Sequence, residues 1–442
     1  MRTEVLNFMS IEKNTNILTV SQDLKERGLI YQYSDEKLFD LIDNGEATAY
    51  VGFDPTSDSL HLGNLIQLLT LRRLQVGNNK VIVLAGGGTG MIGDPSGKTS
   101  ERVLLTIQEI QENVSKVRSQ LEAFVDFSSS ASGAELVNNF DWLSDISILD
   151  FLRDIGKHMT VNQMVAKDSV KSRIEGREQG ISFTEFSYML LQATDFLHLS
   201  DKIGCNLQLG ASDQWGNITA GIELVRRSRA RQVFGLTTPL LLKEDGTKFG
   251  KSESGAIFLD PDKTSPYEFY QYFLRSPDSE VIKYLKFFTF LELSEINELS
   301  LGVQQAPEAR EAQRRLAQEV TRIVHGDHVL GLAERASEAL FSDSIRDMAR
   351  DVVAMALKGA PSISVTKEQF SDGISVLDIM VRAGMVDSKS VARKLISQGG
   401  VYVNNVRCQQ IERELNKLDL LSNDQVLLRK GKRDYLVIEV EI

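Results

Sequence analysis

A strand, a helix and a second strand follow one another closely between residues 48 and 90, and this succession constrains the fold more than any other feature. TAYVGFD is typical of a strand, NLIQLLTLRRLQVG of a helix, and KVIVLAGGGTG of a buried strand that enters a glycine loop. Strands joined by a crossover helix lie parallel in one sheet. CNLQLGAS and DQWGNITAGIELVRR repeat a strand and a helix further along. We therefore expect an α/β fold with a Rossmann-like, doubly wound parallel sheet.

The predicted secondary structure of the 442-residue chain changes twice after this domain. Segments such as APEAREAQRRLAQEVTRIVHG are helical, and we see no strand near them. A Gly/Pro/Ser-bearing segment and then short helices and strands follow. We predict an N-terminal leader at 1–22, the Rossmann-like domain at 23–265, an all-α domain at 266–358, a linker at 359–373 and a small α+β domain at 374–442.

Composition narrows the class of protein. Cys205 and Cys408 lie far apart, which suits a reducing compartment and argues against a disulfide framework or a cysteine-based zinc site. We find no apolar run of the ~18 residues that a membrane span needs, and no targeting peptide. The net charge of −11 argues against a globally basic nucleic-acid binder. Residues 382–433, however, hold 11 Lys/Arg and 5 Asp/Glu, which is the electrostatic footprint of a nucleic-acid site.

Three stretches follow strands, at the edge of the sheet where open α/β folds bind ligands. DPTSDSLHLGN places His61 before a helix whose first N–H groups attract phosphate, although such a histidine could serve only as a helix cap. AGGGTGMIGDPSGKTSER could hold phosphate or form a tight turn. It is not a Walker A loop, because Ile92 stands where that motif requires glycine. KEDGTKFGKSESG could be a solvated loop or could close two ammonium groups on a polyphosphate.

One predicted helix, SFTEFSYMLLQATDFLHL, carries polar side chains where a purely structural helix would carry apolar ones. Tyr188, Gln192 and Asp195 stand at positions i, i+4 and i+7, so they share one face. That face is either solvated or the wall of a ligand site.

Longer motifs identify a family. HLGN resembles the HIGH signature and KFGKS the KMSKS signature of class I aminoacyl-tRNA synthetases. From about Leu24 to the C-terminus, the motifs YVGFDPTSDSLHLGN, GTGMIGDPSGK, YMLLQATDF and GASDQWGNITAG resemble tyrosyl-tRNA synthetases of the bacterial or organellar type. The resemblance implies activation of L-tyrosine with ATP to tyrosyl-adenylate and pyrophosphate, followed by transfer to tRNA(Tyr). It also implies Mg²⁺ that accompanies ATP without a dedicated protein metal site, an α-helical anticodon-binding domain, an S4-like RNA-binding domain, a homodimer, and a cytoplasmic location, with an organelle matrix as the alternative.

The same resemblance implies roles for individual residues. Tyr50 and Asp195 would bind the phenol, and a site that hydrogen-bonds a hydroxyl rejects the analogue without it, a rule for which tyrosyl-tRNA synthetases are a standard example. The implied tyrosine-binding set is Tyr50, Asp94, Tyr188, Gln192, Asp195, Gln208 and Gln214. The implied ATP-binding set is Gly52, Asp54, Thr56, His61, Gly63, Asn64, Asp213, Lys248 and Lys251. The implied catalytic set is His61, Asn64, Lys98, Arg102, Lys248, Lys251 and Ser252, and the implied RNA-binding set is Lys389, Arg393 and Lys394.

Two departures from the family pattern leave alternatives open. Asn64 replaces the second histidine of the HIGH signature, and Ala211 stands where we expect a second glycine beside Gly210. We expect both to tune affinity. The alternatives are a tryptophanyl-tRNA synthetase and a non-catalytic RNA-binding protein on the same scaffold. Small nucleotidyltransferases share a similar histidine loop but lack the long C-terminal region.

Overall fold

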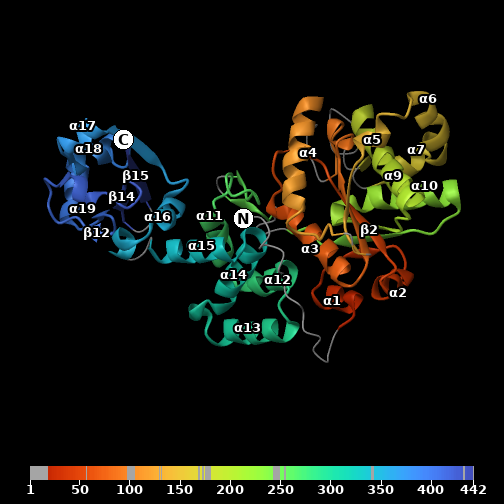
Figure 1. Cartoon of the computed structure of the whole chain (residues 1–442), viewed down its shortest axis with the longest axis horizontal. Coiled ribbons are helices and arrows are strands. Elements are labelled where there is room, and N and C mark those ends of the chain that lie inside the picture. The colour runs from red at the N-terminus through yellow and green to blue at the C-terminus, as the bar shows by residue number, and fades with distance from the viewer. Residues whose placement is uncertain are drawn as a thin grey trace. The chain divides into compact units, whose positions relative to one another are not determined.

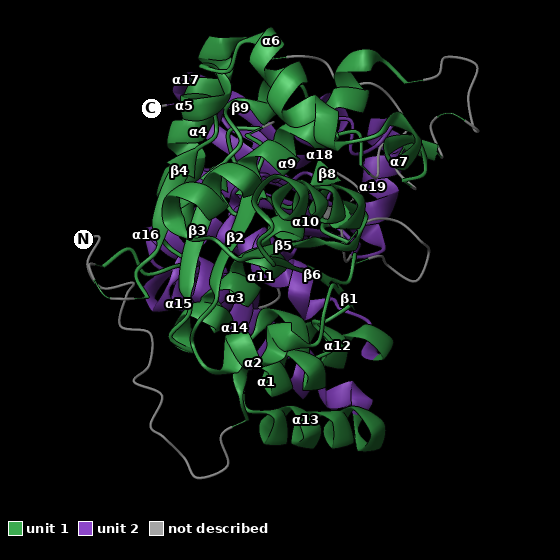
Figure 2. Ribbon diagram, turned by 90° about the vertical axis from the view of Figure 1, so that its right-hand side faces the viewer, with its two compact units in different colours: residues 1–263, 279–306 green, residues 264–278, 307–442 purple. Residues whose placement is uncertain are grey.

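The chain forms two compact units in a computed structural model (Figure 2). The structure describes residues 18–55, 57–96, 105–128, 130, 132–167, 170–171, 174, 181–241, 249–252, 255–339, 343–431 and 434–441. Unit 1 comprises Met1–Lys263 and Ser279–Ala306, and unit 2 comprises Thr264–Asp278 and Pro307–Ile442. The predicted all-α stretch at 266–358 is therefore divided between the two units.

Unit 1 is built on a six-stranded sheet in the order β1-β6-β5-β2-β3-β4. All neighbouring strands are parallel except β1, which is antiparallel to β6. The bounds are β1 Gln32–Tyr33, β2 Thr48–Phe53, β3 Lys80–Ala85, β4 Glu135–Asn138, β5 Leu207–Ala211 and β6 Phe234–Thr238. The chain leaves β2 toward β3 and β4 on one side and returns through β5 to β6 on the other. The predicted doubly wound α/β fold is thus confirmed.

Helices cover both faces of this sheet (Figure 1). Alternate side chains of a strand point to opposite faces, so Tyr50 and Ile82 join the core beneath α9 and α10. Gly204 ends α9 in the left-handed conformation, which glycine adopts without steric cost. The remaining elements of the sheet domain are α3 Leu62–Val76, η1 Thr89–Met91, α4 Ile107–Leu121, α5 Phe140–Leu143, α6 Ile148–Asp150, η2 Phe151–Ile155, η3 Gly156–His158, α7 Val161–Val165, α9 Phe183–Ile203, η4 Ser212–Gln214, α10 Trp215–Arg229, β7 Lys251–Ser252 and β8 Gly255–Ala256.

Two buried arginines explain why part of the all-α stretch belongs to unit 1. Arg27 donates to the carbonyls of Thr289 at 3.3 Å and Leu291 at 2.6 Å, and Arg73 also donates to Thr289. Asp23 accepts from both guanidinium groups and so offsets part of their positive charge. These bonds attach the chain between α12 and α13 to α1 and α3. The bounds are α1 Val20–Glu26, α2 Lys37–Asp43, α12 Asp278–Phe288 and α13 Leu293–Gln305.

Unit 2 joins a group of helices to a small α+β domain. Leu427 and Val437 of the small sheet pack against Val353 and Leu357 of α16, so one core links the two parts. The helices are α11 Pro266–Leu274, η5 Pro307–Ala309, α14 Glu311–His325, α15 Asp327–Ala339, η6 Asp343–Asp347, α16 Arg350–Leu357, α17 Lys367–Ser371, α18 Val376–Arg382, α19 Lys389–Ser397 and η7 Lys417–Asp419. The strands are β9 Ser362–Thr366, β10 Ile374–Ser375, β11 Val401–Val403, β12 Val406–Arg407, β13 Glu414–Leu415, β14 Gln425–Lys430 and β15 Asp434–Glu441.

The segment at 359–373 is not the linker that we predicted. It contains β9 and α17, and β9 pairs in parallel with β15 at the edge of the five-stranded sheet β12-β11-β14-β15-β9. Val365 and Phe370 are buried in the core of this sheet. The small domain therefore begins earlier than residue 374. Across the described parts of the chain, none of the helices combines the length and apolar character needed to cross a bilayer.

Candidate functional site

A cavity of about 520 Å³ opens at the carboxyl ends of β2 and β5. These two strands are neighbours, and the chain leaves them in opposite directions, so they form the switch point at which doubly wound sheets bind ligands. The predicted residues that line the cavity are Tyr50, Gly52, Asp54, His61, Gly63, Asn64, Asp94, Tyr188, Gln192, Asp195, Gln208, Asp213 and Gln214. Ala211 also lies in the wall. Tyr188, Gln192 and Asp195 thus share the cavity-facing side of α9.

Several predicted residues lie outside the described part of the chain. They are Thr56, Lys98, Arg102 and Lys248. Lys251 and Ser252 form β7, but only their backbone is described. Their roles stay predictions.

The deepest wall of the cavity holds two polar side chains in apolar surroundings. Tyr50 and Asp195 are 1% and 2% exposed. Burial raises the pKa of Asp195 to about 8, and burial together with the nearby Asp195 raises that of Tyr50 well above 10. The Tyr50 hydroxyl has no hydrogen-bond partner among the described residues. A buried hydroxyl without a partner is costly, so this wall suits a ligand that brings a polar atom.

Two residues that the sequence did not identify hold Asp195 in place. Asn139 donates from Nδ2 to Asp195 Oδ2 at 3.0 Å, and Trp142 donates from Nε1 to Oδ1 at 2.9 Å. Both bonds lower the pKa of Asp195 and so oppose the effect of burial. Asn139 follows β4, and a polar residue at the end of a strand was the one signal that could have indicated it.

A chain of hydrogen bonds connects this wall to Tyr188. The Tyr188 hydroxyl donates to Asp54 Oδ2 at 2.8 Å, and Thr89 Oγ1 donates to Asp54 Oδ1 at 2.7 Å. Asn139 Nδ2 donates to Thr89 Oγ1 at 2.9 Å and to Asp195. Both carboxylate oxygens of Asp54 therefore accept a hydrogen bond from another residue, one from Tyr188 and one from Thr89.

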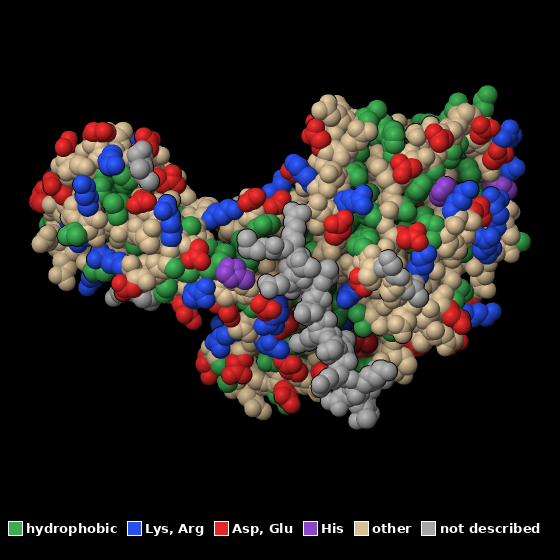
Figure 3. Space-filling view, viewed as in Figure 1, with side chains coloured by type: hydrophobic (Ala, Val, Ile, Leu, Met, Phe, Trp, Pro, Cys, Tyr) green, Lys and Arg blue, Asp and Glu red, His purple; other side chains and the backbone are tan. Residues whose placement is uncertain are grey.

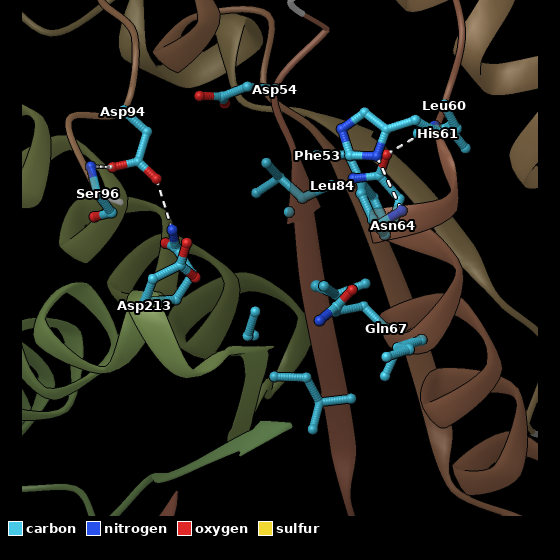
Figure 4. A pocket seen from close by; sticks show the side chains of 18 of the residues that line it. Phe53, Asp54, Leu60, His61, Asn64, Gln67, Leu84, Asp94, Ser96 and Asp213 are labelled. Atoms are coloured by element: carbon cyan, nitrogen blue, oxygen red, sulfur yellow. Dashed lines mark hydrogen bonds between the residues drawn. The ribbon is translucent and has the colours of Figure 1, made fainter. Parts of the chain in front are cut away.

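A second group of polar side chains surrounds Asp94. Gln214 Nε2 donates to Asp94 Oδ2 at 2.6 Å, and the Ser96 N–H donates to Oδ1 at 2.8 Å (Figure 4). Asn217, another residue that the sequence did not indicate, donates to Gln192 Oε1 at 2.9 Å and to Gln214 Oε1 at 3.2 Å. These contacts fix the amide orientations before a ligand enters.

His61 and Asn64 lie at the N-terminus of α3, across the cavity from Asp94 and Asp213 (Figure 4). His61 Nδ1 accepts from the Gly63 N–H at 3.1 Å, and Asn64 Oδ1 accepts from the His61 N–H at 3.0 Å. Since Nδ1 is an acceptor, the neutral ring carries its hydrogen on Nε2. The histidine does cap its helix, and it is also a donor at the positive end of the helix dipole.

Phe249 and Gly250 of the KFGKS motif are held by contacts with neighbouring elements of unit 1. Phe249 packs against Tyr284 and Phe288 of α12, with ring centroids 4.6 and 5.3 Å away. The Ile257 N–H donates to the Gly250 carbonyl at 2.7 Å, and the Leu62 N–H donates to the Ile257 carbonyl at 2.9 Å. The β7–β8 hairpin is thereby attached beside the start of α3.

The predicted RNA-binding residues belong to unit 2. Lys389, Arg393 and Lys394 lie on α19, whose Ala392 and Ile396 are buried in the core of the small domain. Lys389 also forms an ion pair with Asp378.

The chain is similar to known proteins over most of its length. Residues 43–342 match the family described as class I tRNA synthetases (W and Y), and residues 352–438 match the C-terminal domain of tyrosine–tRNA ligases of the SYY type. A tyrosine–tRNA ligase of Roseiflexus castenholzii is 51% identical over 96% of this chain and 99% of its own length. One of Staphylococcus carnosus is 48% identical over 95% and 98%. The truncated mitochondrial tyrosyl-tRNA synthetase of Aspergillus nidulans superposes with a TM-score of 0.66 at 32% identity, over 73% of this chain and 94% of its own.

The raised pKa of Asp195 predicts how stability depends on pH. The folded chain keeps this proton up to about pH 8, whereas the unfolded chain loses it near pH 4. The stabilisation is complete below pH ~4 and is lost as pH rises through about 8. Between pH 5 and pH 7, the ligand-free wild type should lose about 1.4 kcal/mol of unfolding free energy per pH unit relative to Asp195→Asn.

Urea unfolding of both proteins at pH 5, 6 and 7 measures this difference. Asp40→Asn, which makes the same change at an exposed aspartate, is the matched control and should differ from wild type by a nearly constant amount. A constant difference for Asp195→Asn would show that its carboxyl does not keep its proton in this range.

Proposed function

The chain belongs to the tyrosine–tRNA ligases, a family of class I aminoacyl-tRNA synthetases, and from this premise we propose a role for each group of the cavity. The enzyme activates L-tyrosine with ATP, forms tyrosyl-adenylate and pyrophosphate, and transfers the tyrosyl group to tRNA. The amino-acid carboxylate is already an anion, so its attack on the α-phosphate needs no protein base. Catalysis then consists of positioning and electrostatic stabilisation.

Tyr50 and Asp195 bind the phenolic hydroxyl of the substrate. The unpartnered Tyr50 hydroxyl beside the buried Asp195 carboxyl is the observation that carries this assignment. A substrate hydroxyl can donate to one group and accept from the other. Phenylalanine would leave the polar groups of Tyr50 and Asp195 without partners. An indole N–H can donate a hydrogen bond but cannot accept one, so it could satisfy only one of the two groups.

The substrate ammonium binds among Tyr188, Gln192 and Asp94. An ammonium has three donors, and a phenol oxygen, an amide oxygen and a carboxylate oxygen accept them. Asp54 accepts the Tyr188 hydroxyl hydrogen, which leaves the phenol oxygen to act as an acceptor. Gln214 lies beside Asp94 near the substrate carboxylate, and Gln208, whose Oε1 has no partner among the described residues, completes the wall.

The nucleotide binds along the start of α3. His61 and Asn64 direct N–H groups at the β- and γ-phosphates, Gly52 and Gly63 leave room for the nucleotide, and Asp213 accepts from the ribose. Lys98, Arg102, Lys248, Lys251 and Ser252, together with Thr56, would surround the departing pyrophosphate. In the described residues we find no cluster of three His, Cys, Asp or Glu side chains suited to a metal ion. We therefore propose that Mg²⁺ is held mainly by the phosphates of ATP.

The remaining proposals concern tRNA, a second copy and location. The helices at 266–358 bind the anticodon region, and α19 binds the tRNA backbone.

Apolar side chains on α6, η2, α7 and the first turn of α9 face a second copy of the chain: Ile148, Leu149, Leu152, Val161 and Phe183 are 51–75% exposed. Green side chains gather beside α6 along the upper edge of unit 1 (Figure 3). Two buried free cysteines support the reducing cytoplasm, and an organelle matrix is the alternative location.

Amino-acid selection is tested by ATP–pyrophosphate exchange without tRNA, with tyrosine, phenylalanine and tryptophan in parallel. Wild type should respond to tyrosine alone. Tyr50→Phe should raise the KM for tyrosine about ten-fold, change kcat little, and lower the preference for tyrosine over phenylalanine. Tyr33→Phe makes the same change at a surface tyrosine and should leave all values intact. An unaltered preference in Tyr50→Phe would refute the phenol assignment.

The role of α19 is tested by replacing Lys389, Arg393 and Lys394 with alanine. Charging of tRNA should weaken, and the salt dependence of its binding should become shallower by about one unit for each phosphate that the variant no longer neutralises. Exchange without tRNA should not change. A variant without the exposed Lys367 and Lys417 removes two charges against three, so its effect is compared per charge removed. Equal charging by the two variants would exclude α19 as the RNA site.

The second copy is tested by introducing charge into its proposed interface. Leu149→Asp with Leu152→Asp should convert a dimer into a monomer in sedimentation velocity, because two carboxylates would be buried without partners. Leu301→Asp places one such charge on α13, at a leucine that is 54% exposed, and should leave the dimer intact. A dimer that survives the double substitution must use another surface.

A further inference from the structure

Outside the cavity, two aromatic rings stack on each other, and one of them donates a hydrogen bond to the buried Asp195 carboxyl. Trp142 of α5 and His198 of α9 stack with centroids 4.3 Å apart and planes 11° from parallel. Trp142 also donates to Asp195 Oδ1 at 2.9 Å. Neither Trp142 nor His198 belongs to the cavity lining. The hydrogen bond to Asp195 therefore connects the stack to the cavity.

Helix α9 provides both contacts of the indole. Asp195 and His198 are three residues apart and so lie on the same face of the helix. The indole meets the helix with its edge at Asp195 and with its face at His198. A hydrogen bond alone allows the ring to tilt about the donor–acceptor direction, and it weakens as the N–H loses alignment. The second contact fixes the ring plane.

The side chain of Trp142 is held less firmly by its surroundings than the side chain of Asn139. Helix α5 has four residues and no side-chain cap, and Trp142 is only partly buried. Asn139 is fully buried, and its Oδ1 also accepts the Gly88 N–H at 2.7 Å. Of the two donors to Asp195, Trp142 is therefore the one whose position depends on an additional contact.

The stacking of His198 on Trp142 depends on the flat shape of the imidazole ring more than on its charge. Burial and the neighbouring Lys202 lower the pKa of His198, while Asp201 opposes them. A neutral imidazole stacks on an indole through dispersion and quadrupole terms that other flat rings share. A phenyl ring should therefore replace it, whereas a branched aliphatic side chain should not.

We propose that His198 is a positioning residue for the selection of tyrosine. It holds the plane of Trp142, Trp142 orients the Asp195 carboxyl, and Asp195 receives the substrate hydroxyl. The inference rests on the proposed binding of the phenol by Tyr50 and Asp195. It concerns the amino-acid end of the cavity only, so the KM for ATP should not respond.

The test compares His198→Leu, which removes the flat ring, with His198→Phe, which keeps one. In tyrosine-dependent exchange, His198→Leu should raise the KM for tyrosine about ten-fold, keep kcat within about two-fold, and lower the tyrosine-to-phenylalanine preference by a similar factor. His198→Phe should restore both values to within about three-fold of wild type. Lys202→Ala, one turn further along α9, is the control and should match wild type.

Thermal unfolding of each variant separates positioning from stability. If His198→Leu does not fold, His198→Gln removes the ring while keeping a polar side chain. The inference is overturned if the ring-free variant keeps the KM and preference of wild type while Trp142→Phe loses them. It is also overturned if His198→Phe is as impaired as His198→Leu. If Tyr50→Phe also keeps full preference, the phenol assignment itself fails, which is a distinct result.

Discussion

The burial of the Asp195 carboxyl is the constraint on which the rest of the site depends. Its side chain is 2% exposed, and burial, together with a smaller effect of the nearby Asp54 charge, raises its pKa. A polar group taken out of water must regain hydrogen bonds inside the protein, or the fold loses several kcal/mol. Asn139, directly after β4, and Trp142 of α5 provide them. The buried carboxyl on α9 is thereby connected to the segment that follows the edge strand.

Further hydrogen bonds connect Asp195 to other polar residues of the cavity. Asn139 bonds both Asp195 and Thr89, Thr89 bonds Asp54, and Asp54 accepts from Tyr188. The groups proposed for the phenol and for the ammonium are thus ends of one hydrogen-bonded chain. This chain is anchored on β2, η1, β4 and α9, which are elements of a rigid core. A site supported in this way needs little reorganisation when the substrate enters, so it can select by geometry.

The sequence predicted the features that depend on neighbouring residues and missed those that depend on residues far apart in the chain. The strands at 48–53 and 80–85 were predictable because apolar runs and a glycine loop are local patterns, and the cavity face of α9 followed from spacing alone. Asn139 and Trp142 gave no such pattern, because β4 is only half-buried along its length and their partner lies more than 50 residues away. The error at 359–373 has the same origin. SISVT becomes a strand by pairing with Val437–Glu441, which no local pattern could indicate.

The two ends of the cavity solve different physical problems. At the end proposed for the amino acid, where close analogues have to be rejected, the polar groups of Tyr50 and Asp195 are buried in the core. At the start of α3, where we propose that the phosphates bind, the side chains of His61 and Asn64 accept hydrogen bonds from backbone N–H groups of the first turn. Each side chain uses an acceptor atom to cap the helix. An asparagine in place of a second histidine keeps both functions, since its oxygen closes the cap and its amide still donates. The positive charge needed at the phosphates can then come from the helix dipole and from lysines on polar loops, and the cap itself has no need to carry it.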